Sequence, residues 1–330
     1  MKKSYAHIDL WKLIFAVAVL SIHTSALSGF NAEIRWYASA LFTRMGVPFF
    51  MITSSFLLGK KIRAQGPEGI KAYRKALLPK LLFWGALALV MNAPIWYLES
   101  RSIAETLLTI VQYALFYPKG AMWFLWALIV SSFLLEFFLK HKVPVSVMGV
   151  IALALFAFAL LCNTYYFVVE NTAFSTVVEG YLSACVSARN GVFLFVYMLL
   201  GYMLSSERGK ERGKGSLRVA CIIGFGLLVW EAISLQNVNK LDDSSLFLSY
   251  LFLIPAFILL LTRSESPVPH NRELRSLSGV MYYTHPVFSS PLKLFLSGGW
   301  MRFSIVLAAT LIVWLLTRRS GNKIIKKLLY

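Results

Sequence analysis

The chain has 330 residues, of which 58% are hydrophobic and only 15% are charged. Soluble globular domains average roughly 45–50% apolar and about 25% charged residues, so this composition excludes a disordered chain, a coiled coil and a disulfide-stapled scaffold. Lysine and arginine outnumber aspartate and glutamate by 33 to 15, which gives a net charge of +18. Such an excess occurs in nucleic-acid-binding proteins and in membrane proteins with basic loops, so its position along the chain decides between them.

Apolar runs of about 20 residues, the length that crosses about 30 Å of hydrocarbon, recur along the chain. We therefore predict a single all-α polytopic membrane domain over residues 1–330, with about ten transmembrane helices and no soluble domain. The predicted spans are residues 8–27, 37–59, 79–98, 121–139, 143–161, 190–206, 217–235, 244–262, 277–296 and 300–317. Only Ser297, Gly298 and Gly299 separate the last two spans, which indicates a tight turn.

The lysines and arginines concentrate in alternate loops between these spans. If the N-terminus is cytoplasmic, the inside segments hold most of them, notably residues 2–3, 60–80, 205–216, 263–275 and 318–327. This alternation follows the positive-inside rule and predicts that both termini are cytoplasmic. Basic loops of this kind meet anionic membrane lipids, so the net charge requires no nucleic acid.

Two local features of the loops lead to separate expectations. Residues 65–78, with Pro67 near their start, indicate a short helix that lies on the inner membrane surface. Cys162 and Cys185 both fall in the predicted outer loop 162–189. In an oxidising exterior they can form a disulfide or stay unpaired, and both alternatives are open at this point.

The first span carries two ionisable side chains, Lys12 and His23. A charged group near the bilayer centre costs at least about 2.5–3.5 kcal/mol on insertion scales, so such groups usually face a cavity. Their separation is close to three helical turns, so both point the same way, and Asp9, three residues before Lys12, can pair with it. Imidazole is a suitable general base at neutral pH. The structural alternatives are a snorkelling Lys12 and a His23 that only hydrogen-bonds another helix.

The second and fourth spans add a cation, a proline and two tryptophans. Arg44 lies near the outer end of the second span, and Pro48 predicts a break or kink there. A broken helix is tolerated in a membrane where it is buried or lines a cavity, although many proline kinks have no function. Trp123 and Trp126 open the fourth span, where they fit either a binding site or an aromatic belt.

Two later segments supply further polar candidates. Arg189 and Asn190 stand at the mouth of the sixth span, where they can bind an anionic or carbonyl-bearing ligand or simply cap a helix. His285 precedes Pro286 in the ninth span and is a second intramembrane imidazole beside a predicted kink. Its structural alternative is a buried histidine with satisfied hydrogen bonds.

Four segments, in order, resemble the integral-membrane acyltransferase family 3. Lys12 and His23 stand at the R-x10-H motif of the family, inside its opening I-D-L-x-[RK]. The segment RMGVPFFMITSSFLL resembles its V-P-x-F-F-x-I-S-G-[YF] helix, AMWFLWALI its H-x-W-[FY]-L-x-x-L stretch, and SGVMYYTHPVF its S-x-x-I-Y-L-x-H-P helix. The resemblance covers essentially the whole chain. An I-D-x-x-K before the histidine and an R-N-G near the sixth span are similar to the membrane domain of vancomycin-resistance-type serine racemases.

The resemblance implies an enzyme of the bacterial plasma membrane that moves an acyl group, most simply acetyl, from cytoplasmic acyl-coenzyme A. The acceptor is a hydroxyl or amine of an envelope carbohydrate or lipid-linked glycan, and no metal is implied. His23 and Lys12 are then expected to be catalytic. The residues expected to hold the coenzyme A phosphates are Lys71, Arg74 and Lys75. The residues expected to bind the acceptor are Asp9, Arg44, Trp123, Arg189, Asn190 and His285.

The sequence departs from the family pattern at Lys12, where arginine is usual. A guanidinium can bind a phosphate or carboxylate through two hydrogen bonds, whereas the lysine ammonium acts as a point charge. The R-x-x-R of the inner loop appears only as Lys71-Ala-Tyr-Arg74. Two other functions stay open. A kinked helix and intramembrane charges also suit a transporter for a serine-like amino acid, and a scaffold for a separate cytoplasmic enzyme is a third interpretation. Racemisation is not expected, because no racemase domain follows the last span.

Overall fold

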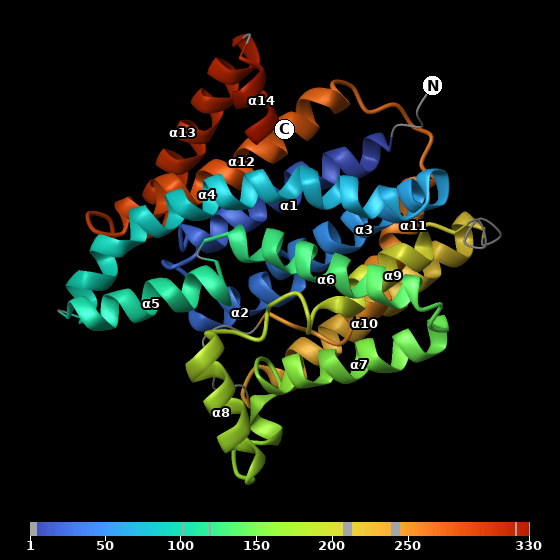
Figure 1. Cartoon of the computed structure of the whole chain (residues 1–330), viewed down its shortest axis with the longest axis horizontal. Coiled ribbons are helices and arrows are strands. Elements are labelled where there is room, and N and C mark those ends of the chain that lie inside the picture. Colours follow the sequence, from blue (N-terminus) through green and yellow to red (C-terminus); the bar gives the residue numbers. More distant parts are fainter. Residues whose placement is uncertain are drawn as a thin grey trace.

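The computed structural model describes residues 5–100, 102–118, 120–206, 213–238, 245–320 and 322–329. All regular secondary structure in these ranges is helical, as Figure 1 shows. The predicted all-α architecture is therefore confirmed. Lys2, Lys3 and residues 207–212 of the predicted basic loop lie outside the described residues.

Each predicted span overlaps a helix of the structure. The α-helices of the described ranges are α1 (Ala6–His23), α2 (Ala32–Leu41), α3 (Gly46–Gln65), α4 (Glu68–Ser100), α5 (Ile103–Leu115), α6 (Met122–Lys140), α7 (Val145–Leu161), α8 (Phe174–Cys185), α9 (Phe195–Leu204), α10 (Lys214–Leu235), α11 (Tyr250–Thr262), α12 (Asn271–Leu292), α13 (Trp300–Arg319) and α14 (Lys323–Leu329). Two short 3-10 helices cover Thr43–Met45 and Tyr166–Val168.

Six helical segments of the described chain are long and apolar enough to cross a membrane: α1, α2 with α3, α4, α6, α10 and α13. Helices α7, α9 and α11 are apolar but have only 17, 10 and 13 residues. Helix α12 has 22 residues, with charged side chains in its first turns. The protein is thus a multi-pass membrane protein built from long spans and shorter apolar helices.

The second predicted span is a broken helix, as Pro48 indicated. Helix α2 ends at Leu41, a 3-10 turn follows, and α3 begins at Gly46. Pro48 occupies the first turn of α3, where its missing N–H needs no partner. The break places Arg44 in the short turn between the two helices, so its side chain is not part of a regular helical face.

The expectation of a separate surface helix over residues 65–78 is wrong. Helix α4 runs without interruption from Glu68 to Ser100 and includes Pro79. Contacts before the proline hold this segment against the bundle: the Tyr73 hydroxyl lies 2.9 Å from Ser54 Oγ, and Arg74 pairs with Glu136 on α6. Tertiary contacts therefore outweigh the helix-breaking tendency of proline at this position.

The predicted outer loops contain helices that the apolar pattern did not reveal. Helix α5 is amphipathic and begins at an N-cap formed by Ser102, and α8 lies within the loop predicted for residues 162–189. In Figure 1, α5 lies beside the end of α4, and α8 projects from the bundle. Cys162 and Cys185 are both free thiols, so the structure favours the unpaired alternative.

Helices α3 and α9 approach closely because small residues face each other across their contact. A Cβ atom on Gly201 would lie 2.3 Å from the carbonyl oxygen of Ile52, and one on Gly59 would lie 2.2 Å from Ser205 Oγ. Ser55 Oγ also donates to the carbonyl of Met198. Small residues four apart on both helices are the usual means of close helix packing in membranes.

Both ends of the described chain reach the same end of the bundle. His7 Nε2 lies 2.9 Å from the carbonyl oxygen of Ser266, just before α12. At the end of α13, Arg318 forms a 2.5 Å ion pair with Glu273 in the first turn of α12. We call this the basic end of the bundle, and we call the end at which α1 finishes with His23 the opposite end.

The close approach of α3 and α9 predicts a large effect of one added methyl group. We expect Gly201→Ala to lower the free energy of unfolding by about 1–3 kcal/mol, because the backbones must separate to admit the Cβ atom. The matched control is Gly226→Ala on α10, where the space is open and alanine favours the helix. Thermal unfolding in detergent measures both, and equal midpoints for the two variants would contradict the proposed close packing.

Candidate active site

A cavity of about 450 Å³ lies at the opposite end of the bundle, beside the C-terminus of α1. Its size is that of a small-molecule site. We call it the His23 cavity; its polar lining residues include His23, Arg44, Asn92, Tyr113, Tyr117, Trp123, Arg189, Ser245, Ser289 and Lys293. The structure thus brings together His23, Arg44, Trp123 and Arg189, all of which the sequence had singled out.

The backbone of His23 is held from two neighbouring helices. Ser289 Oγ on α12 donates to the His23 carbonyl at 2.8 Å, and Arg302 Nη2 on α13 donates to it at 3.4 Å. Arg302 is buried and also donates to the carbonyls of Thr24 and Leu296. These bonds satisfy carbonyls that a helix C-terminus leaves open, so they fix the point from which the imidazole projects.

His285 lies on α12 directly behind His23. The two ring centroids are 4.9 Å apart, with 46° between the ring planes. His285 is 1% exposed, and its Nδ1 donates to the carbonyl of Met281 at 2.8 Å. It does not line the His23 cavity. The second imidazole of the site therefore supports the first one rather than facing the ligand space.

Aromatic rings and a guanidinium form one wall of the His23 cavity. Trp123 stacks on Tyr117, with ring centroids 5.6 Å apart and 15° between the planes. The Arg189 guanidinium lies 5.1 Å from the Trp123 ring centroid and 5.5 Å from that of Tyr117. Arg189 also donates to Ser245 Oγ at 3.4 Å. Flat apolar faces beside a cation and hydroxyls suit a ligand that is polar at its edges and apolar on its face.

Three cations give the His23 cavity a positive potential. Arg44, Arg189 and Lys293 line it from three different parts of the chain. Arg44 sits in the break between α2 and α3, and its Nε donates to Ser39 Oγ at 3.3 Å. Such a lining stabilises negative charge that develops on a bound group.

A polar groove of about 720 Å³ adjoins the His23 cavity. Ile22, Thr43 and Arg44 line both spaces, so Arg44 stands at their junction. We call it the serine groove; its polar lining residues include Ser21, Ser25, Ser28, Ser39, Gln236 and Asn237. The groove extends the ligand space from the His23 cavity toward the loops of the opposite end.

A cavity of about 620 Å³ lies toward the basic end, and Lys12 faces it from α1. We call it the Lys12 cavity, and its cationic lining residues are Lys12, Lys61, Lys80, Arg272 and Arg275. Four helices therefore contribute positive charge to one space, although these residues are far apart in the sequence. A cavity of this charge suits a polyanionic ligand such as a phosphate ester.

Three aromatic side chains separate the two cavities. Phe50, Phe124 and Tyr282 are the residues that line both of them within the described chain. Phe124 contacts both others edge to face, with ring centroids 6.2 Å from Phe50 and 5.7 Å from Tyr282. The Tyr282 hydroxyl donates to the carbonyl of Ala121. We call these three side chains the aromatic partition.

Asp9 pairs with Arg275 rather than directly with Lys12. Asp9 is 3% exposed and accepts two hydrogen bonds from Arg275, at 3.0 Å from Nε and 2.6 Å from Nη2. Asp9 faces α12, whereas Lys12, three residues on, extends into the cavity. Asp9 lines neither cavity, and it holds Arg275 at the edge of the Lys12 cavity rather than contacting an acceptor in the His23 cavity.

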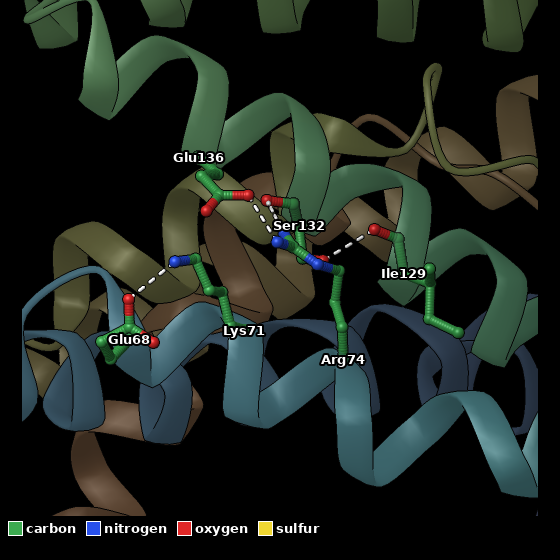
Figure 2. A network of polar contacts seen from close by, with 6 residues as sticks. All are labelled: Glu68, Lys71, Arg74, Ile129, Ser132 and Glu136. Atoms are coloured by element: carbon green, nitrogen blue, oxygen red, sulfur yellow. Dashed lines mark hydrogen bonds and ion pairs between the residues drawn. The ribbon is translucent and has the colours of Figure 1, made fainter.

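The three residues expected to hold coenzyme A lie outside all three cavities. Figure 2 shows Lys71 paired with Glu68, at 2.7 Å, on the exposed side of α4. Figure 2 also shows Arg74 bound to Glu136, at 2.5 Å, and to the Ser132 carbonyl of α6. Lys75 is exposed. Arg74 thus joins α4 to α6, and none of the three faces the Lys12 cavity.

Asn190 is half-buried and does not line the His23 cavity. Its amide donates to the hydroxyl of Tyr181, and its Oδ1 is buried without a hydrogen-bond partner among the described residues. The adjacent Arg189 reaches the cavity, because neighbouring side chains in this irregular segment point in different directions. Of this pair, Arg189 lines the His23 cavity and Asn190 does not.

A family model described as an acyltransferase domain matches residues 5–319. The chain belongs to this acyltransferase family. The match covers nearly the whole described chain, and it confirms the resemblance that the four ordered segments indicated. No solved structure matches the chain.

A curated relative of this acyltransferase is an amino-acid racemase from Enterococcus faecalis. The two are 26% identical over 259 residues, which are 77% of this chain and 35% of the racemase. The chain thus spans about a third of that relative. This similarity is consistent with the resemblance to the membrane domain of racemases that the sequence suggested.

Several residues that line or support these cavities were missed by sequence reasoning. Lys293, Lys80 and Arg302 each lie in or beside a predicted span, so the signal that identified Lys12 and His23 could have found them too. Lys61 and Arg272 gave no such signal, because they lie in basic loops whose charge the positive-inside rule already explains. Only the packing of the helices shows which loop cations face a cavity.

The environment of the Asp9–Arg275 pair predicts that removal of Arg275 destabilises the protein more than removal of Asp9. Removing Arg275 strands a buried carboxylate, whereas removing Asp9 leaves an arginine whose side chain is 54% exposed. We expect Arg275→Ala to destabilise the protein by about 1–3 kcal/mol and Asp9→Ala by less. The double variant should be more stable than Arg275→Ala alone. Thermal unfolding in detergent tests this order, and equal losses for the two single variants would contradict it.

Proposed function

We propose that this protein transfers an acyl group, most simply acetyl, from acyl-coenzyme A to a hydroxyl or amine of a bacterial envelope carbohydrate. The observation that carries the proposal is the position of His23. Its imidazole lines a cavity of small-molecule size, and the same helix reaches a strongly cationic cavity about three turns away. A base at one end and a polyanion site at the other suit a donor and an acceptor that arrive from opposite sides of the membrane.

The Lys12 cavity is the proposed donor site. Coenzyme A carries several phosphate charges, and lysine and arginine bind phosphate by charge-assisted hydrogen bonds. Lys61, Lys80 and Arg272 line this cavity beside Lys12, whereas Lys71 and Arg74 are engaged with glutamates outside it. In this proposal Lys12 serves the donor, since it lies about 16 Å along α1 from His23.

The proposed chemistry takes place in the His23 cavity. An unprotonated ring nitrogen of His23 takes the proton of the acceptor hydroxyl while the oxygen attacks the thioester carbonyl carbon. The tetrahedral intermediate collapses, the carbon–sulfur bond breaks, and the coenzyme A thiolate takes up the proton from the imidazolium. Negative charge on the former carbonyl oxygen develops in a cavity that Arg44, Arg189 and Lys293 line.

The acceptor assignment rests on the lining of the opposite end. Trp123 and Tyr117 offer flat apolar faces, and the adjoining serine groove offers hydroxyl and amide groups. A sugar presents apolar ring faces and a rim of hydroxyls, so it matches both surfaces. The continuity of the two spaces at Arg44 leaves room for an acceptor larger than one sugar, such as a lipid-linked glycan.

A second function has a specific observation in its favour. Two cavities at opposite ends of a bundle, separated by three side chains, also suit alternating access by a small-solute transporter. The racemase relative makes an amino acid the natural solute for this alternative. Coenzyme A binding separates the two functions, because an amino-acid transporter has no use for a phosphate-binding cavity.

The donor assignment predicts which lysines control coenzyme A affinity. We expect Lys61→Ala and Lys80→Ala each to weaken acetyl-coenzyme A binding about tenfold, or about 1.5 kcal/mol, because each removes a charge-assisted contact. Lys71→Ala and Lys75→Ala are matched controls that should bind as wild type does. Calorimetry on detergent-purified protein measures all four. Losses confined to the two controls would overturn the assignment, and no binding by folded wild type would favour the transporter.

The role of His23 predicts a loss of turnover without a loss of binding. We expect His23→Ala to slow the release of thiol from acetyl-coenzyme A, to acceptor or water, by about 10²–10⁴-fold. Its affinity for acetyl-coenzyme A should stay within error of wild type. Ser289→Ala, which removes a hydrogen bond to the His23 carbonyl, should show a smaller loss. Wild-type rates in His23→Ala would exclude the general-base role.

A further inference from the structure

His285 holds a hydrogen-bond acceptor that the structure leaves unused. Its Nδ1 faces the carbonyl oxygen of Met281 at 2.8 Å, and a carbonyl can only accept, so Nδ1 carries the proton. In the neutral ring Nε2 is then an acceptor. This atom is buried and has no hydrogen-bond partner among the described residues. An unpaired buried acceptor lowers stability, and its presence in a folded protein calls for an explanation.

The neighbour of this acceptor is the proposed general base. The ring of His23 lies with its centroid 4.9 Å from that of His285, and the planes are inclined by 46°. The second side-chain torsion of histidine is broad, so the His23 ring can turn within its well at little cost. Rings at this separation can form one hydrogen bond when an N–H of His23 points at Nε2 of His285.

Resting on the proposed function, we propose that His285 is a positioning residue for His23. Its Nε2 accepts one N–H of His23, so that the other His23 nitrogen is unprotonated and faces the cavity. A chain then runs from the Met281 carbonyl through His285 and His23 to the acceptor hydroxyl, with a donor and an acceptor at each step. When His23 takes up the proton, the same bond stabilises the imidazolium, as the third member of a catalytic triad does.

The surroundings explain why an imidazole serves here in place of a carboxylate. Arg44, Arg189 and Lys293 all line the His23 cavity, and a carboxylate beside His23 would be drawn into an ion pair with one of them. A neutral imidazole offers a lone pair without that competing attraction. Its orientation is fixed by the Met281 carbonyl and by complete burial on α12.

The test compares two replacements of His285, of which only one offers a hydrogen-bond acceptor. His285→Phe fills the space without an acceptor, and His285→Gln keeps an acceptor near the position of Nε2. We expect His285→Phe to lower kcat for acetyl-coenzyme A about tenfold or more, with KM unchanged, as loss of a partner that orients a reacting group does. His285→Gln should restore most of the rate. The matched control is His141→Phe at the exposed end of α6, which should leave the rate unchanged.

The outcomes separate this inference from the proposed function. Equal losses in His285→Phe and His285→Gln would assign the effect to ring packing and overturn the positioning role, as would wild-type kcat in His285→Phe. Absence of turnover in folded wild type would instead overturn the proposed function. If a His285 variant fails to fold, a measurement on the wild-type protein still tests the inference. With 5 histidines in the chain, ¹⁵N shifts of labelled imidazoles should show His285 protonated at Nδ1 alone, and a proton on Nε2 would overturn the inference.

Discussion

The site depends on two contacts that hold α1 and α12 side by side. They run in the same direction and are joined near both ends, by Asp9 with Arg275 at the basic end and by Ser289 with the His23 carbonyl at the opposite end. Because the two contacts are about four turns apart, neither helix can slide or rotate against the other without breaking one of them. The His23 imidazole and the rim of the Lys12 cavity are therefore set in one rigid frame.

The distribution of charge follows from the cost of placing ions in an apolar bundle. Cations line the two cavities as two groups instead of facing lipid, and the buried Arg302, outside both groups, donates to backbone carbonyls. Asp9 is buried, and its charge is matched at once by the guanidinium of Arg275. Between the groups lie aromatic rings, which contribute packing without charge. The arrangement keeps these charges paired, hydrogen-bonded to the backbone or beside a polar space, as the insertion cost requires.

Much of the fold was accessible from hydrophobic run length, because a membrane leaves few ways to bury a backbone. The break before α3 was accessible through Pro48, and His23, Arg44, Trp123 and Arg189 through their chemistry in or beside apolar spans. The cationic lining of the Lys12 cavity was not accessible. A run of basic residues does not show which side chains turn inward, so the sequence favoured Lys71, Arg74 and Lys75, whereas the structure places Lys61, Lys80 and Arg272 at this cavity. Apolar run length did not reveal helices α5 and α8, because amphipathic helices between spans carry no long apolar run.

The aromatic partition has a consequence for the membrane as a barrier. Two positively lined spaces lie toward the two ends of the bundle, and the rings of Phe50, Phe124 and Tyr282 are the side chains that border both of them among the described residues. If a thioester passes between these rings, the same opening joins the two spaces into a path that small anions could follow. In the proposed reaction the pantetheine arm of the donor must therefore fill the opening between the two cavities for as long as the rings are apart. An enzyme of this design would keep the membrane potential intact by opening only around its substrate.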